Sequence, residues 1–436
     1  MPAPVQRKLI ISHPRISSIQ DHNGALNVID SSIEITAGGP AINSNRPVYL
    51  SNSYVRGAEV TAAFGGKTAL EGKASLWTHV REYAGAPAGP YPVWVNGRRQ
   101  ADFRDVAPAS GAPPANLQAR HALPLSLPRW DQQGVVNVRE APYLAKGDGR
   151  SDDTAALERA IAEHDTLFLP KGVYLLSRPL QLRARTRLFG VAQAFTGLAP
   201  VEDAPAFSNA AAPRPLVDTP DDRGAGTVVA RLRIDTAGLA GARSLRWRAG
   251  RSSVVFNLRF GRTPSIVVEG NGGGRWFDFF FGDTRRKDPD YRLLSVRGTR
   301  EPLVFYMFDP EHARSGFMTE FVDARNVTLY ALKGETHEIG HQESGTRPLM
   351  LVKNSRNFRI YGPGGIMGAA AGHPPYIFRF ENCTDFLIAN EGHQQYRFFA
   401  DPSSWSALVD VSPAGEVKTP GSEYFVLYKR GAASGH

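Results

Sequence analysis

The stretch that decides the fold begins KGDGRSDDT at residues 146–154 and continues as AALERAIAEH and, from 166, TLFLPKGVYLL. Asp152 or Asp153 can cap a helix, because a short carboxylate accepts the free amide hydrogens of the first turn. Leu157 and Ile161 then fall on one helical face. A helix followed by very short apolar strands, each broken by a turn, predicts a coil that stacks on itself.

This stretch resembles the opening of the pectate-lyase-like superfamily of right-handed parallel β-helices. The glycines, paired aspartates, helix and Pro-x-Gly-x-Tyr turn at 170–174 occur in the order found there. In that family the helix caps the N-terminal end of the coil stack, which implies that residues 143–436 form the main β-helical domain. The family includes pectin lyases, glycoside hydrolases and phage tailspikes, so the fold alone does not fix the chemistry.

Composition excludes several classes of protein. The chain has 436 residues, of which 42% are hydrophobic, so it should be globular. No apolar run approaches the ~18–20 residues that span a membrane. The single Cys383 excludes a disulfide framework and a cysteine-based zinc cluster. The net charge is +9, but the basic residues are scattered and predict no nucleic-acid partner. No signal peptide is visible, although the family resemblance implies a secreted or periplasmic protein.

The N-terminal part carries a repeat of its own. The strand-like stretches from Leu26 and from Val48 are followed by polar corners that start at Asp30 and Ser51, 21 residues apart. This interval fits one turn of a β-helix and predicts a partial β-helix unit over residues 1–84. Residues 85–142 read as a Pro/Ala-rich linker with a hairpin at Asn96-Gly97. The Pro- and Gly-rich residues 193–226 read as a long loop, either a groove wall or a dispensable excursion.

Three later segments share a pattern. Aligned on Asn326, Asn357 and Asp385, they lie 31 and 28 residues apart, and each polar corner precedes alternating apolar residues. This is the signature of strands with one buried face, so the corner side chains are expected to be structural.

Two coil stacks joined by a linker resemble the double β-helix exo-β-1,3-glucanases, the laminarinase-type glycoside hydrolases. The expected fold is therefore all-β, with two right-handed parallel β-helical units side by side and an N-terminal capping helix on the second. The resemblance also implies an active site in the cleft between the units, hydrolysis with inversion, and a glutamate of the second unit as general acid. The first unit is expected to be incomplete in this chain.

Glycoside hydrolysis needs a carboxylic acid that keeps its proton near neutral pH and a group that holds a water molecule. Glu335 follows a predicted strand at a glycine-marked corner, and we choose it as the general acid. Glu338, Glu343 and Glu320 are alternates. His337 to His341 matches the letters of a zinc motif, but Gly340 and the strand-rich surroundings argue against the helix it needs, so no metal or cofactor is expected.

Other residues are candidates for binding a sugar. The segment 306–314 places an aromatic ring, a carboxylate, a histidine and an arginine on one corner, and Trp276 offers a further aromatic platform. Large aromatic rings are more often core residues, so that interpretation stays open for each of them. The expected substrate-binding residues are Trp276, Tyr306, Glu311, His312, Arg314, Lys333 and His337.

Three functions remain open from the sequence. The first is hydrolysis of a β-glucan-like polysaccharide. The second is a lyase that cleaves an acidic polymer by β-elimination, for which Lys333, Tyr330, His312 and Arg314 are available. The third is a non-catalytic, carbohydrate-binding β-helix. The expected partner is a polysaccharide in each case, and the sequence does not reveal the oligomeric state.

Overall fold

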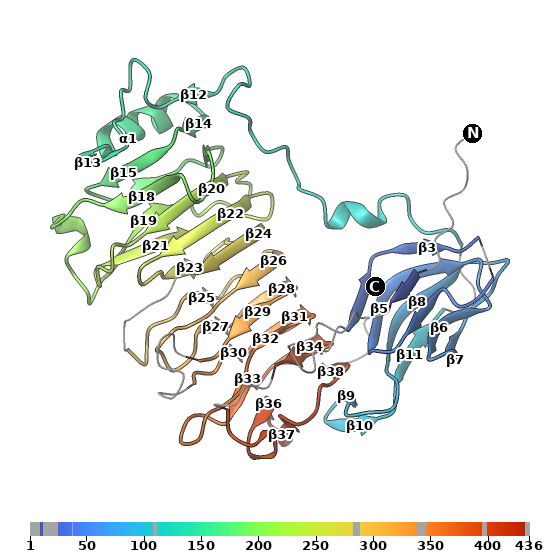
Figure 1. Ribbon diagram of the computed structural model, residues 1–436. Coiled ribbons are helices and arrows are strands. Elements are labelled where there is room, and N and C mark those ends of the chain that lie inside the picture. The colour runs from blue at the N-terminus through green and yellow to red at the C-terminus, as the bar shows by residue number, and fades with distance from the viewer. Residues whose placement is uncertain are drawn as a thin grey trace.

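The computed structural model describes residues 9–11, 25–36, 38–107, 111–281, 288–337, 346–394 and 399–431. Figure 1 shows a long stack of coils, with a smaller N-terminal unit beside its C-terminal end and an extended segment running back to its start. Nearly all described elements are strands; α1 (Thr154–Glu163) is the one α-helix among them. None of the described helices is long and apolar enough to cross a membrane.

The stack is built from two long sheets and a short third one, and within each sheet strands of successive coils pair in parallel. The first sheet contains β12 (Val136–Asn137), β14 (Thr166–Leu169), β17 (Arg187–Gly190), β20 (Val228–Asp235), β22 (Val254–Gly261), β24 (Gly274–Phe281), β26 (Leu303–Asp309), β28 (Arg325–Tyr330), β31 (Arg356–Tyr361) and β34 (Thr384–Ala389), with β13 (Asp148–Asp152), β15 (Gly172–Leu176) and β18 (Thr196–Pro200) as a side branch. The second contains β16 (Leu180–Gln181), β19 (Arg214–Asp218), β21 (Ala242–Trp247), β23 (Ile266–Val268), β25 (Leu294–Arg297), β27 (Thr319–Val322), β30 (Met350–Lys353), β33 (Tyr376–Glu381), β36 (Ser406–Ser412) and the antiparallel β37 (Gly415–Pro420). The third contains β29 (Lys333–Glu335), β32 (Gly364–Ile366) and β35 (Gly392–His393). This is the arrangement of a parallel β-helix.

The predicted helix lies at the start of the stack. Leu157 and Ile161 face the core, as the spacing predicts. The two aspartates bind different backbone groups. The side chain of Asp152 accepts a hydrogen bond from the backbone amide of Thr154 at 3.0 Å, whereas that of Asp153 accepts from the backbone amides of the preceding loop. Asp153 is the N-cap residue but its side chain makes no capping hydrogen bond; it ties the start of the helix to the loop that leads into it.

The three predicted corners coincide with turns of the coil. Asn326, Asn357 and Asp385 have φ of 58°, 51° and 52°, the left-handed conformation that short polar side chains tolerate. The amide of Asn357 donates a hydrogen bond to the side chain of Asn326 at 2.7 Å. Parallel pairing of β28, β31 and β34 then fixes the 31- and 28-residue intervals as single coils. The structural interpretation of these corners is confirmed.

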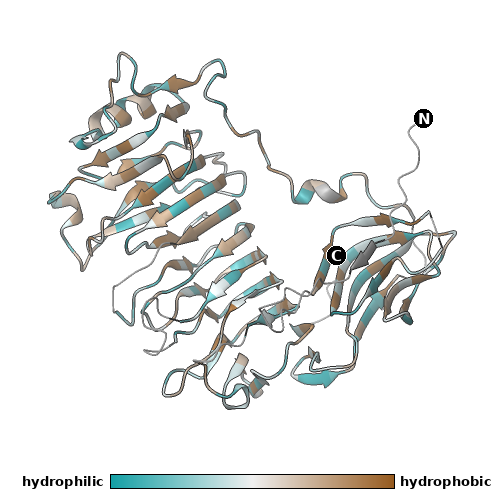
Figure 2. Ribbon diagram, in the orientation of Figure 1, coloured by the Kyte–Doolittle hydropathy of each residue, from teal (hydrophilic) through white to brown (hydrophobic). Residues whose placement is uncertain are grey.

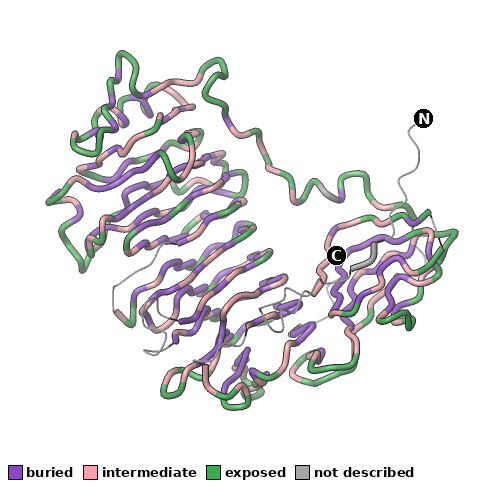
Figure 3. Tube along the Cα trace, in the orientation of Figure 1, coloured by how far each residue is buried: buried purple, intermediate pink, exposed green. Residues whose placement is uncertain are grey.

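The interior of the stack is a continuous apolar core. Hydrophobic residues recur in coil after coil of the stack (Figure 2), and buried residues run along most of it (Figure 3). The largest of them include Trp247, Trp276, Phe279 and Phe305, which contact one another edge-on or tilted. This rigid interior fixes the outward-facing side chains that form the candidate site.

The N-terminal unit has two sheets around its own core. One contains β2 (Leu26–Ile29), β3 (Ser32–Glu34), β5 (Val48–Arg56), β8 (Thr78–Gly85) and β11 (Phe103–Val106). The other contains β1 (Leu9–Ile11), β4 (Ile42–Ser44), β6 (Val60–Phe64) and β7 (Lys67–Glu71). The predicted 21-residue repeat corresponds to one pair of stacked segments, because β2 and β3 both pair in parallel with β5. At the corner, the side chain of Asn52 donates a hydrogen bond to Asp30. The other strands of these sheets, β7, β8 and β11, pair antiparallel with their neighbours, whereas the coils of a β-helix pair in parallel. The expected second β-helix beside the first therefore stays a prediction.

The segment expected to be a linker contributes strands to both units. The turn at Asn96-Gly97 joins β9 (Val93–Val95) to β10 (Arg98–Gln100), and β9 pairs with β38 (Leu427–Arg430) of the stack. After η1 (Leu117–Arg120), Leu123, Leu125 and Leu127 pack on the outer face of the first sheet. Residues 193–226 also differ from expectation, because the buried β18 and β19 belong to the coils.

Candidate active site

A cluster of charged side chains lies where β26 ends and β29 passes beside it. The Lys333 ammonium contacts Glu311, Glu335 Oε1 at 2.6 Å and Asp309 Oδ1 at 3.5 Å. Glu311 and Glu335 form a parallel bridge between adjacent coils. Residues 333, 335 and 337 alternate along an extended segment, so their side chains share one face. We call Asp309, Glu311, His312, Lys333, Glu335 and His337 the Lys333 cluster.

Two histidines complete the Lys333 cluster. His312 Nε2 lies 3.2 Å from Glu335 Oε2, and its Nδ1 donates a hydrogen bond to the carbonyl oxygen of His337 at 3.1 Å. Both ring nitrogens of His312 thus face acceptors. Burial alone would lower the pKa of His312, but the hydrogen bonds to Glu335 and His337 outweigh it and raise that pKa. Burial and the neighbouring His312 charge lower the pKa of His337, which favours its neutral form.

The cluster gives its carboxyl groups opposite proton affinities. Burial, together with repulsion from Glu311, raises the pKa of Asp309 to about 7 in spite of Lys333. Burial would also raise the pKa of Glu335, but hydrogen bonds from His312 and Lys333 reverse the effect and lower it to about 2. At neutral pH Asp309 therefore holds a proton much of the time, while Glu335 is an anion.

The same side chains include one set with metal-ligand geometry. The ligand atoms of His312, Glu335 and His337 lie within 4.8 Å of one another. A metal ion needs a bare imidazole nitrogen, whereas both nitrogens of His312 face acceptors. Lys333 also already neutralises the other oxygen of Glu335. The described residues thus form a charge-balanced acid–base cluster that a metal ion could enter only by displacing protons.

A groove runs between the N-terminal unit and the outer face of the stack. It comprises two cavities of about 820 and 800 Å³, which share Ile29, His121, Tyr306, Tyr330 and Tyr361 in their linings. We call it the junction groove. Gly364 and Gly365 line the larger cavity and pair with Lys333 and Gly334 of the preceding coil. The junction groove therefore reaches the coil adjacent to the Lys333 cluster over bare backbone.

Residues 135–211 match one protein family, described as rhamnogalacturonase A/epimerase, pectate lyase-like. This is the stretch that contains α1 and the first coils. No curated protein sequence matches the chain.

Several solved structures are similar. An iota-carrageenase complexed to iota-carrageenan fragments is 12% identical with a TM-score of 0.40, covering 60% of this chain and 58% of that one. The tailspike gp49 of Acinetobacter baumannii bacteriophage Fri1, a capsular polysaccharide depolymerase, is 14% identical with a TM-score of 0.37, covering 61% and 59%. The A-module of the Azotobacter vinelandii mannuronan C-5 epimerase AlgE6 is 16% identical with a TM-score of 0.24, covering 64% and 99%. The chain spans 63% of the Geobacillus virus E2 ORF18 structure and 58% of the carrageenase.

Four of the expected site residues meet in the Lys333 cluster together with Glu335, namely Glu311, His312, Lys333 and His337. Tyr306 lies apart from them, in the junction groove. Arg314 is partly buried on the segment after His312. Glu338, Glu343 and His341 lie outside the described residues. His337 itself forms an antiparallel bridge with Thr346.

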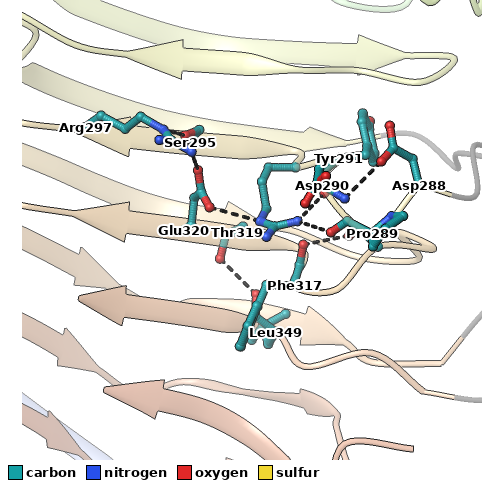
Figure 4. A network of polar contacts seen from close by, with 12 residues as sticks. Asp288, Pro289, Asp290, Tyr291, Ser295, Arg297, Phe317, Thr319, Glu320 and Leu349 are labelled. Carbon is teal, nitrogen blue, oxygen red and sulfur yellow. Dashed lines mark hydrogen bonds and ion pairs between the residues drawn. The ribbon is translucent and has the colours of Figure 1, made fainter. Parts of the chain in front are cut away.

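Two expectations are wrong. Trp276 is 0% exposed, because it points inward from β24 and packs against other core aromatics, so it cannot form a platform for a sugar. Glu320 lies on β27 of the second sheet, where Ser295, Arg292 and Arg297 hold it in an ion-pair network (Figure 4). Its carboxyl group is held by these structural contacts on the second sheet, away from the Lys333 cluster.

The sequence analysis did not choose Asp309, Asp30 or His121 as site residues, although Asp30 marks a predicted corner and Asp309 lies in the candidate segment 306–314. Asp309 stands two residues before Glu311 in an extended segment, which is the spacing for side chains on the same face. That spacing is a signal that could have found it. Asp30 and His121 come from distant segments and meet Tyr306 only through the packing of the N-terminal unit, so no local pattern marks them.

Proposed function

We propose that the protein hydrolyses glycosidic bonds of a β-glucan-like polysaccharide at the Lys333 cluster. Asp309 is the general acid, and the Glu335 carboxylate holds the attacking water. The observation that carries the proposal is that the Lys333 ammonium contacts both carboxyl groups, Glu335 Oε1 at 2.6 Å and Asp309 Oδ1 at 3.5 Å. Burial raises the pKa of Asp309, whereas hydrogen bonds from His312 and Lys333 lower the pKa of Glu335. Two carboxyls held in opposite protonation states are what acid–base cleavage of a glycosidic bond requires.

The steps follow from these protonation states. The polysaccharide enters through the junction groove and crosses the bare backbone of Gly364 and Gly365. Asp309 gives its proton to the leaving glycosidic oxygen as the C–O bond breaks. A water molecule held by anionic Glu335 attacks the anomeric carbon and gives its proton to the Glu335 carboxylate. Lys333 stabilises the negative charge that develops on Asp309.

The role of Glu335 thus differs from the expectation that it is the acid. Glu335, with a pKa of about 2, is almost never protonated at neutral pH and so cannot donate a proton. Asp309, with a pKa of about 7, is protonated in a large fraction of the molecules. Lys333 and His312 cause the difference, since both donate to Glu335. Inversion at the anomeric centre is the outcome that the family resemblance implies, and NMR of the first product anomer measures it.

The test compares Asp309→Asn with Glu335→Gln on a natural β-glucan and on an aryl glucoside. Loss of the acid should slow glucan hydrolysis by about 10²–10⁴-fold and aryl glucoside hydrolysis much less, because an aryl oxide leaves without a proton. Loss of Glu335 should slow both substrates alike. Glu320→Gln, a carboxylate outside the cluster, is the control and should retain activity in its folded fraction.

The opposite pattern would reassign the roles. If Glu335→Gln is the variant that the aryl leaving group rescues, Glu335 is the acid, as the sequence suggested. If the wild-type protein releases no reducing sugar from any glucan of a panel, the hydrolase proposal fails.

A further inference from the structure

Three ligand atoms of the Lys333 cluster converge on one point. The Nε2 atom of His312 lies 3.2 Å from Glu335 Oε2, and the Nε2 atom of His337 lies 3.7 Å from the same oxygen. One ligand atom from each of these residues lies within 4.8 Å of those of the other two. Ligands that surround a zinc ion tetrahedrally at ~2.0–2.1 Å are about 3.3 Å apart. The first distance to Glu335 matches this separation, and the second is only slightly longer.

Backbone contacts between two adjacent coils hold these ligands together. Glu335 and His337 stand two residues apart on an extended segment, so their side chains share one face. The backbone amide of His312, on the preceding coil, donates to the carbonyl oxygen of Glu335 at 3.4 Å. The two imidazole rings then meet edge to face with centroids 4.9 Å apart. The arrangement uses only the first histidine of the zinc-like motif at 337–341, so it needs no helix.

Outer hydrogen bonds orient two of the three ligands. The Nδ1 atom of His312 donates to the carbonyl oxygen of His337 at 3.1 Å, which turns Nε2 toward Glu335. A histidine that binds a metal ion usually donates its other ring N–H to such an acceptor. Lys333 contacts Oε1 of Glu335 at 2.6 Å and leaves Oε2 to face the histidines. Both histidines are buried, so their rings have little freedom to turn away.

A metal ion would exchange with a proton at this point. The proton on Nε2 of His312 lies between that nitrogen and Glu335 Oε2, the two atoms that the ion would join. The ion takes the place of this proton, which leaves to the solvent. Glu311 Oε1 lies 3.6 Å from the same nitrogen and adds negative charge that offsets Lys333. Two imidazoles and a carboxylate are a ligand set that suits Zn²⁺.

We propose that His312, Glu335 and His337 form an inhibitory zinc site. A Zn²⁺ ion bound there occupies Oε2 of Glu335 and so removes the carboxylate that holds the attacking water. The ion has no part in hydrolysis and acts as a reversible regulator. Its inhibitory effect rests on the proposed function of the Lys333 cluster, whereas its binding does not.

Isothermal titration of zinc chloride into the full-length protein, first freed of metal with a chelator, measures the binding. We expect one ion per chain, and we expect the ion to raise the melting temperature because it binds the folded state. Glu335→Gln keeps the shape of the side chain but replaces the anionic ligand with a neutral amide. His337→Ala removes a second ligand. Each should weaken zinc binding at least about tenfold, since even the loss of an outer hydrogen-bond partner costs ~10–100-fold.

His164→Ala is the matched control. It removes an imidazole at the end of α1, where His164 meets the ring of Tyr143 with centroids 5.8 Å apart. This variant should bind zinc as the wild type does. Thermal unfolding of each variant without zinc shows whether it is folded. For a folded variant that has lost a ligand, zinc should no longer raise the melting temperature.

The effect on activity completes the test. Saturating zinc should slow glucan hydrolysis by about 10²–10⁴-fold, the usual worth of a positioned base, and excess chelator should restore the rate. Three results would overturn the proposal: no saturable zinc binding by the wild type, wild-type affinity in both Glu335→Gln and His337→Ala, or an unchanged hydrolysis rate with zinc bound. If the wild type binds zinc at these residues but hydrolyses no glucan even without it, the proposed function fails while the zinc site stands.

Discussion

Asp309 keeps its proton because its surroundings oppose a negative charge there. Burial removes water from the carboxyl, Glu311 adds repulsion, and Lys333 shares its positive charge among three carboxylates. The pKa of Asp309 in the folded protein is therefore higher than in the unfolded chain, where it is near the ordinary 3.8. The folded state binds the extra proton, so this residue contributes less stability as pH rises from about 4 to about 7.

The pH dependence of kcat/KM for hydrolysis should follow the titration of Asp309. If Asp309 is the acid, kcat/KM should fall about tenfold per pH unit above about 7, because the deprotonated aspartate cannot serve the leaving group. Anionic Glu335 should impose no loss down to strongly acidic pH, since its pKa is about 2. The measurement is kcat/KM between pH 4 and 9 on a glucan. A profile that stays flat to pH 9 would exclude Asp309 as the proton donor.

Part of this site could be predicted from the sequence, and the reason is local spacing. Lys333, Glu335 and His337 alternate on one extended segment, and Glu311 lies one coil earlier, so their meeting follows from the fold. Trp276 was misassigned because alternation does not say which neighbour faces outward; here Phe277 does, and Trp276 is core. The hydrogen bonds of His121 to Asp30 and Tyr306 depend on docking of the N-terminal unit, which no spacing encodes.

At the scale of single elements, the coils depend on left-handed corner residues. Asn354 and Asn382 occupy corresponding turns with φ of 49° and 51°, beside the column of Asn326, Asn357 and Asp385. These short polar residues let each strand turn sharply and leave the coil in register. The corners and the capping helix could be predicted because both are local signals. The antiparallel strands that complete the N-terminal unit could not, because their pairing joins separate segments without a repeated corner.

Asn357 provides a test of the corner argument. Asn357→Ala loses the hydrogen bond to Asn326 and replaces asparagine, which tolerates the left-handed conformation at φ 51°, with a residue that disfavours it. The change should therefore destabilise the stack by about 1–2 kcal/mol. Asn357→Gly loses the same hydrogen bond without the strain and should cost clearly less. Urea unfolding followed by tryptophan fluorescence compares the two. Equal losses would show that the left-handed conformation is not the limiting feature.

At the scale of the whole molecule, the N-terminal unit is fastened to the C-terminal end of the stack. Strand β9 pairs with β38, and the side chain of Asn390 donates to the carbonyl oxygen of Leu26 at 2.8 Å. An apolar contact between Tyr49 and Tyr361 lies beside these polar ones. We call this set of contacts between the N-terminal unit and the end of the stack the seam. Both walls of the junction groove depend on the seam, because one wall comes from each unit.

The seam contains a buried ion pair between Glu82 and Lys429, whose side chains are 7% and 3% exposed. Tyr49 donates to Glu82 at 3.1 Å, and the Lys429 ammonium lies 4.7 Å from the centre of the Phe103 ring. Lys429→Met removes one charge and leaves Glu82 buried without its partner, which should cost about 3–5 kcal/mol. The double variant Glu82→Leu with Lys429→Met removes both charges and should recover most of that loss.

Urea unfolding measures the cost, and limited proteolysis of the connecting segment near residues 111–127 reports whether the units have separated. Lys429→Met should be cut faster than wild type, and the double variant should be cut at nearly the wild-type rate. The surface pair Arg129–Asp131 supplies the control, because Arg129→Met breaks an exposed ion pair and should have little effect on unfolding. A cost below about 1 kcal/mol for Lys429→Met would mean that water reaches Glu82 and that the seam is held by its strand pairing instead.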